Sequence, residues 1–134
     1  MSSIFSKIIS GEIPSYKIAE EKNFFAFLDI NPLAKGHALV VPKKEIDYVF
    51  DIDDDLYKGL LMFTKKVALA IEKSVKCIRM GMVVYGLDVP HAHIHLIPLL
   101  GSNDIDFKKP PLKLTSEEFK EIAERISDEF EKNK

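Results

Sequence analysis

Three of the four histidines in the chain fall within five residues, at His91, His93 and His95. Apolar residues occupy the positions between them, as in a β-strand whose alternate side chains face the same side of the sheet. The spacing therefore predicts three imidazole rings on one face of a strand, with the intervening side chains in the core behind them.

Three interpretations of this cluster compete. Structural histidines are one, although aligned rings repel each other when protonated and gain little by packing. Neutral imidazoles at alternate positions also suit zinc, copper or nickel, but a further ligand such as Asp88 or His37 could join only through folding. In covalent catalysis, the third interpretation, one histidine attacks a substrate while its neighbours orient it and stabilise the developing charge.

The residues before the histidines predict a short helix, three strands and a long helix. Apolar residues recur at helical spacing over 4–9, after two serines that can cap a helix. Segments 16–19, 23–28 and 37–41 are rich in strand-forming residues, and the first two are expected to form a hairpin.

Three aspartates at 53–55 open the long helix expected over 53–73, where they favour the positive end of the helix dipole. Apolar residues form two stripes along it, one at 56, 60, 63, 67 and 71 and one at 61, 62, 68 and 69. A helix with two apolar sides must bury both, so we predict that one side meets the sheet and the other a partner chain, which could be a second copy.

Two further strands are expected over 78–85 and 93–100, joined by a tight connection at 86–88. Five strands fit an α+β fold with one antiparallel sheet and the helices on one side of it. A polar loop at 101–114 precedes a last helix, which begins with the capping-box pair Thr115 and Glu118. We expect a single domain spanning residues 1–134.

The composition excludes several classes of protein. With 134 residues, 46% of them hydrophobic, the chain can form one core without disulfides or metals. A net charge of −2 implies no general attraction to nucleic acid or anionic lipid. Neither a membrane span nor an export signal is expected, and the lone Cys77 favours a reducing compartment, so a cytoplasmic protein is predicted.

The segment His-Ala-His-Ile-His-Leu-Ile at 91–97 resembles the signature of the histidine triad (HIT) family, in which three histidines alternate with apolar residues. Further matching motifs occur at 4–14, 26–32 and 36–43. Within the family, the chain resembles the branch of small hydrolases related to the histidine-triad nucleotide-binding proteins. The resemblance implies a HIT-like core over 4–100, and the loop and helix at 101–134 form an extension outside it.

The resemblance also implies an activity, which is cleavage of a nucleotide at its α-phosphate through a nucleotidyl-histidine intermediate. A nucleoside phosphoramidate or a dinucleoside polyphosphate would be the substrate, and a nucleoside monophosphate the product, with no cofactor required. His93 is the implied nucleophile, with one ring nitrogen held by the carbonyl of His91. His95 would contact the phosphate oxygens and the leaving group, and His37 would complete a catalytic cluster of four.

Binding residues follow from the same resemblance. Asp29 matches an aspartate that accepts hydrogen bonds from both ribose hydroxyls, although an Asx-turn would equally account for an Asp at this position. Four apolar residues match those that sandwich the base, but their spacing alone would suit ordinary core residues. These residues are Phe5, Ile8, Phe27 and Ile30.

The sequence departs from the family pattern near the triad. Leu87 lies where many relatives have glutamine, Asp88 where they have a hydroxyl, and Leu99 where an arginine is frequent. These differences leave open a nucleotide-binding or scaffold protein with little turnover, or a protein that binds zinc through the triad. The family habit of pairing two protomers into a continuous sheet implies a homodimer.

Overall fold

A single antiparallel sheet forms the centre of the molecule. In the computed structural model, which describes residues 2–134, the strands follow the order β1-β2-β3-β5-β4, and every neighbouring pair is antiparallel. Their bounds are Lys17–Glu20 for β1, Phe24–Leu28 for β2, Ala38–Pro42 for β3, Arg79–Val83 for β4 and Ile94–Leu99 for β5. The predicted α+β fold with one five-stranded antiparallel sheet is confirmed.

Three α-helices accompany the sheet, each begun by a side chain that caps it. They are α1 (Ile4–Ile9), α2 (Asp54–Ser74) and α3 (Ser116–Lys132), and a short 3-10 turn at Val49–Asp51 leads into α2. The hydroxyl of Ser3 and a carboxylate oxygen of Asp53 accept from the first-turn amides of α1 and α2. Both hydrogen bonds of the predicted capping box, between Thr115 and Glu118, are present at α3.

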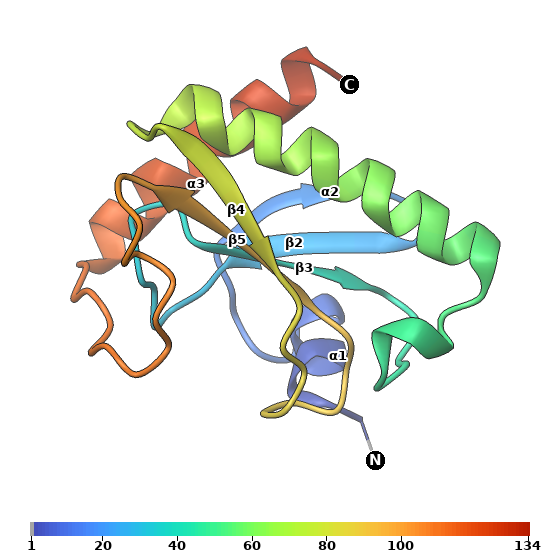
Figure 1. The fold of residues 1–134 in the computed structure, drawn as a ribbon. Coiled ribbons are helices and arrows are strands. Elements are labelled where there is room, and N and C mark those ends of the chain that lie inside the picture. Colours follow the sequence, from blue (N-terminus) through green and yellow to red (C-terminus); the bar gives the residue numbers. More distant parts are fainter. Residues whose placement is uncertain (1) are drawn as a thin grey trace.

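The sheet is covered on both faces. Side chains of β2 alternate between two clusters: Phe24, Ala26 and Leu28 pack with α2 and α3, whereas Phe25 and Phe27 pack with Phe5 of α1. Helix α1 therefore lies below the sheet in Figure 1, and α2 and α3 lie above it. The prediction of helices on one side was wrong for α1, because the unbroken apolar run of β2 needs cover on both faces.

The connection between β4 and β5 is longer than predicted, since residues 84–93 lie between the two strands. Ala92 donates its backbone N–H to the carbonyl of Ile46 and not to a residue of β4, and Pro90 has no N–H to donate. Of the three histidines, only His95 lies within β5, and His93 immediately precedes it. The expected tight connection at 86–88 was therefore wrong.

The long helix buries its first apolar stripe as predicted. Phe63 is 1% exposed and contacts Phe24 of β2 and Phe130 of α3, with ring centroids 5.5 and 5.7 Å apart. Helix α3 thus covers part of α2 that the sheet does not reach. Met62 and Leu69, from the second stripe, remain 56% and 48% exposed.

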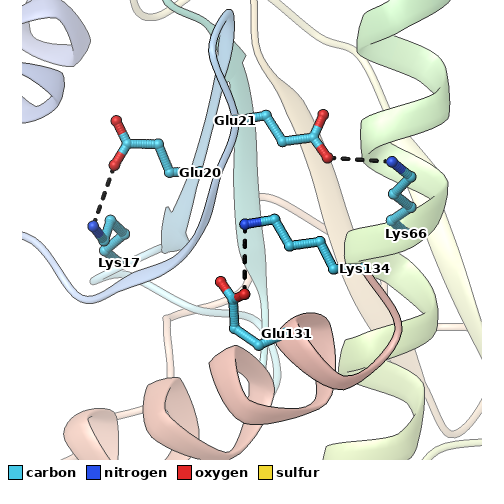
Figure 2. Close-up of polar contacts among 6 residues, drawn as sticks. All are labelled: Lys17, Glu20, Glu21, Lys66, Glu131 and Lys134. Carbon is cyan, nitrogen blue, oxygen red and sulfur yellow. Dashed lines mark hydrogen bonds and ion pairs between the residues drawn. The ribbon is translucent and has the colours of Figure 1, made fainter.

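Several ion pairs lie on the surface, away from the triad. Figure 2 shows Lys17 with Glu20, Glu21 with Lys66, and Glu131 with Lys134. The pair of Glu21 and Lys66 joins the β1–β2 turn to α2, with a nitrogen–oxygen distance of 3.2 Å. Exposed pairs of this kind contribute little to stability, so the core clusters dominate. Among residues 2–134, no helix is long and apolar enough to span a bilayer.

Candidate active site

A cleft of about 440 Å³ lies on the α1 face of the sheet, beside the start of β5. Its wall comes from α1, from the end of β2 and the loop after it, from the connection into β5, and from the segment that follows β5. The cleft brings together most of the predicted site residues: Phe5, Ile8, Phe27, Asp29, Ile30, Asp88, His93 and His95. His91 and His37 lie behind this lining, buried against His93 and His95.

The ring of His93 is oriented by the backbone. Its Nδ1 lies 2.8 Å from the carbonyl oxygen of His91, and a carbonyl can only accept, so Nδ1 carries the proton. In the neutral ring, the lone pair is then on Nε2. Among residues 2–134, no group hydrogen-bonds to this nitrogen. Since every fully buried side-chain nitrogen of these residues has a partner, Nε2 of His93 is not fully buried. Nε2 of His93 therefore presents an unshared lone pair at the cleft.

A chain of hydrogen bonds also determines which nitrogen of His95 carries a proton. The N–H of Leu33 donates to Nδ1 of His37 at 2.9 Å, so a neutral His37 has its proton on Nε2. That N–H donates to Nδ1 of His95 at 3.0 Å. The remaining nitrogen of His95, Nε2, is therefore a hydrogen-bond donor suited to an anionic oxygen.

Asp29 adopts the local turn weighed from the sequence and still keeps one oxygen near the cleft. Its Oδ1 accepts from the N–H of Asn31 at 2.9 Å, which is an Asx-turn. Its Oδ2 lies 3.5 Å from Nε2 of His37. Burial raises the pKa of this carboxyl, and the hydrogen bond from Asn31 opposes the rise. The turn and a ligand-binding role are compatible, because they use different oxygens.

Aromatic and aliphatic side chains form the other wall of the cleft. Phe5 lies edge-on to Phe27 and to His93, with ring centroids 5.6 and 4.9 Å apart. Ile8 and Ile30 complete this wall, and Ile30 remains 66% exposed. An apolar wall of this kind suits a planar ring that stacks without strong recognition of its edges.

Sequence reasoning missed the contribution of the segment after β5. Phe107 lines the cleft and packs against His95, with ring centroids 4.9 Å apart, and Lys109 and Pro111 lie beside it. The loop expected at 101–114 exists, and three of its residues also line the cleft. A lone aromatic residue in a polar loop was the available signal, and it gave no indication of which surface the loop would meet.

Asp88 lies in the wall of the cleft, as its position in the sequence suggested, whereas Leu87 is 79% exposed outside the lining. The charge of Asp88 favours the protonated form of His95, against the larger effect of burial. A carboxylate near a site for phosphate repels the phosphate oxygens and attracts a cationic leaving group.

The nearest approach to a metal site among residues 2–134 is the group Asp29, His37 and His95, whose donor atoms lie within 4.8 Å of one another. A histidine that binds a metal normally donates its other N–H to an acceptor. In His37 the other nitrogen, Nδ1, instead receives the N–H of Leu33. Coordination through Nε2 would break that hydrogen bond, so the surroundings of His37 fit a proton better than a metal.

We expect the protein to lose stability as the pH falls from 7 to 5. Burial, with a smaller contribution from His95, lowers the pKa of His37 to about 3, and burial likewise lowers the pKa of His95 to about 4. The unfolded chain takes up these protons below about pH 6.5. The free energy of unfolding is therefore at its full value above about pH 6.5. Below that pH it falls by up to about 1.4 kcal/mol per pH unit for each ring.

Urea unfolding at several pH values measures this loss as a shift of the midpoint. Asp29, which faces His37, has a pKa raised by burial and so regains stability on acidification, and Asp88 favours the protonated form of His95. Both carboxyls therefore reduce the slope, and the attraction of Asp88 for the protonated form of His95 is smaller than the effect of burial on that ring. A midpoint that stays constant from pH 7 to 5 would contradict the expectation.

Fold and site together define a single-sheet protein whose histidine cluster opens on an apolar cleft. The chain belongs to the HIT family, because residues 10–101 match the family model of the HIT domain.

Relatives support this assignment along most of the chain. A HIT-like protein of Borreliella burgdorferi is 39% identical over 132 residues, covering 92% of this chain and 95% of the relative. An adenosine 5'-monophosphoramidase of Schizosaccharomyces pombe is 36% identical over 129 residues, covering 95% and 97%. The crystal structure of a hypothetical histidine triad nucleotide-binding protein from Sulfolobus tokodaii superposes with a TM-score of 0.86 at 28% identity, covering 96% of this chain and 92% of that one.

Proposed function

We propose that the protein hydrolyses nucleotides at the α-phosphate, with a nucleoside phosphoramidate as the substrate class best supported and a dinucleoside polyphosphate as the second. The observation that carries the proposal is the hydrogen bond from Nδ1 of His93 to His91, which leaves the lone pair of Nε2 at a cleft with apolar walls. The relatives named adenosine 5'-monophosphoramidase in three yeasts, at 34–40% identity, support the phosphoramidate.

In the first step, Nε2 of His93 attacks the α-phosphorus. A bond forms between this nitrogen and phosphorus, and the bond from phosphorus to the leaving nitrogen breaks, its electron pair departing with the amine. The N–H of His95 donates to the phosphate oxygens, because phosphoryl transfer depends mainly on positioning and on stabilising charge. The carbonyl of His91 stabilises the positive charge that develops on the ring of His93.

In the second step, water attacks the same phosphorus and His93 leaves with its lone pair restored. The proton that the amine takes in the first step comes from Nε2 of His95, and the water that attacks in the second step returns a proton to that nitrogen while its hydroxyl ends on phosphorus. The products are a nucleoside monophosphate and a free amine. No metal ion takes part in the proposed steps, since neutral imidazoles and fixed N–H groups supply the stabilisation.

For binding, we propose that the base lies between Phe5, Ile8, Phe27 and Ile30, and that Oδ2 of Asp29 accepts hydrogen bonds from the ribose hydroxyls. Oδ2 is the oxygen that the Asx-turn leaves free. Asp88 at the leaving-group end would attract an amine that carries a positive charge, which favours a phosphoramidate over an anionic polyphosphate.

The decisive experiment mixes the purified protein with adenosine phosphoramidate or diadenosine tetraphosphate in the presence of a chelator, with AMP release followed by chromatography. Release of AMP from the phosphoramidate is expected. Tight binding of AMP without turnover of either substrate would instead favour the binding or scaffold alternative, and activity that the chelator abolishes would favour the zinc alternative.

We further propose that two copies pair along β4. This strand is at the edge of the sheet, with β5 as its neighbour on one side, and an edge strand offers free backbone groups to a second chain. Apolar side chains lie around it: Met82 is 59% exposed, and Leu69 of α2 and Ile78 line a hollow together with Met80 of β4. A second copy would bury this surface, as the two-sided apolar helix predicts.

Replacing Met82 with glutamate is expected to convert the dimer to a monomer, because the substitution buries a charge in the paired surface. Light scattering at micromolar concentration measures the mass of both forms. Lys120→Glu, an exposed change on α3, serves as the control and should leave the dimer intact. A wild-type chain that is already monomeric would refute the pairing.

A further inference from the structure

The N-terminal segment is tied to the triad by a compact hydrogen-bond network that the proposed chemistry does not use. The hydroxyl of Ser3 lies 2.7 Å from Nδ1 of His91 and accepts from the N–H of Ser6 at 3.0 Å. One carboxylate oxygen of Glu45 accepts both from the N–H of Ser3, at 2.6 Å, and from the hydroxyl of Ser6, at 2.7 Å. Glu45 and His91, which are 42 and 88 positions away from Ser3 in the sequence, thus both hydrogen-bond to it.

The directions of these hydrogen bonds can be assigned. Nε2 of His91 lies 2.7 Å from the carbonyl oxygen of Pro42, which can only accept, so Nε2 carries the proton. Nδ1 of His91 is therefore an acceptor, and the Ser3 hydroxyl donates to it. Ser3 is the only partner of this nitrogen among residues 2–134, and the ring of His91 is fully buried. Without Ser3, Nδ1 would be left without a partner and out of reach of water.

His91 in turn sets the state of the nucleophile. Its carbonyl oxygen accepts a hydrogen bond from the N–H at Nδ1 of His93, and this leaves the lone pair on Nε2. The same network caps α1, whose Phe5 packs edge-on against His91 and His93, with ring centroids 5.8 and 4.9 Å away. A change at Ser3 therefore acts on the tautomer of His93 and on the wall beside it at once.

We propose that Ser3, held by Glu45, is a positioning residue that keeps His93 in its reactive tautomer through His91. This inference rests on the proposed function only for its kinetic test, because the tautomer itself is observable in the free protein. The network is a physical link between the first turn of the chain and the nucleophile.

Long-range proton–nitrogen NMR of the imidazole rings reads the tautomers directly. In the wild type, we expect His93 to carry its proton on Nδ1 and His91 to carry its proton on Nε2. In Ser3→Ala, the ring of His93 should become a mixture of tautomers as its hydrogen bond to the His91 carbonyl loosens, whereas the Pro42 carbonyl should still hold the His91 proton on Nε2. The kcat for AMP release should fall about tenfold, because a loosened nucleophile is presented to phosphorus in a poorer orientation. The KM should change less, since the residues proposed to hold base and ribose are untouched.

Matched variants separate this effect from a general loss of structure. Ser3→Thr retains the hydroxyl and should restore the wild-type tautomers and most of kcat. Ser10→Ala removes an exposed hydroxyl at the opposite end of α1, which donates to Lys7, and should change neither. Should Ser3→Ala fail to fold, Glu45→Ala on the surface should give a smaller shift in the same direction.

The proposal is overturned if Ser3→Ala, or Glu45→Ala in its place, leaves the His93 spectrum unchanged. It is equally overturned if Ser3→Thr loses as much kcat as Ser3→Ala, because the hydroxyl would then not be the active feature. If the wild type releases no AMP from any substrate, the proposed function fails, but the NMR comparison still decides whether Ser3 positions His93.

Discussion

Replacing His93 with asparagine is expected to lower the rate of AMP release by about 10⁴-fold or more, the scale seen when a covalent nucleophile is removed. Asparagine can still donate an N–H to the carbonyl of His91, but it has no ring nitrogen with a lone pair to attack phosphorus. Steady-state kinetics measure the loss. Binding of AMP, followed by calorimetry, should remain within a few-fold of wild type, because the substitution leaves the apolar wall and Asp29 in place.

Intact-mass analysis provides the matching positive test. Wild-type protein quenched during turnover should carry one added nucleotidyl group, located on His93 after digestion, and the His93→Asn variant should carry none. An adduct on another histidine, or a variant that retains a tenth of the wild-type rate, would refute the assignment of the nucleophile.

The substitution Phe63→Ala is expected to cost about 3–5 kcal/mol of the free energy of unfolding, as for other large aromatic residues removed from a core. The Phe63 ring is 1% exposed and joins the sheet, through Phe24, to α3, through Phe130. Its removal leaves a cavity where three elements meet. Since small domains are stable by only about 5–15 kcal/mol, urea unfolding at pH 7 should detect the loss as a much lower midpoint.

Two other variants calibrate this measurement. Phe63→Leu keeps most of the apolar volume and should cost less than half as much as Phe63→Ala. Lys58→Ala, on an exposed position of the same helix, should change the free energy of unfolding by about 0.5 kcal/mol or less. If Phe63→Ala and Lys58→Ala unfold at the same urea concentration, the packing between α2, β2 and α3 does not have the importance assigned to it.

Local patterns were sufficient to predict the elements themselves. The aspartates at 53–55, the apolar stripe through Phe63, and the pair Thr115 and Glu118 each act within one or two turns of helix, and all three predicted features are present. The alternation of histidine and apolar residues likewise predicted which side chains share a face, with Ile94 packed in the core behind the rings.

Long-range pairing accounts for what the sequence did not predict. The alternation of histidine and apolar residues extends back to His91, but β5 begins only at Ile94. The N–H of Ala92 donates instead to the carbonyl of Ile46, which belongs to no strand. No local pattern connects Ser3 to Glu45, or Phe107 to His95, since each contact depends on how distant segments meet. Even so, the cleft brings together His93, His95 and Asp29, as the resemblance implied.

The order of strands in the sheet has a consequence for biosynthesis. Strand β5 is inserted between β3 and β4, yet it is the last strand to leave the ribosome. Until then the nascent chain has an open edge along β3, and β4 has no neighbour to pair with. The open edge of β3 is therefore covered only after translation has passed Leu99. Because an uncovered edge favours aggregation, ribosome-bound chains of intermediate length should be the form that most needs a chaperone.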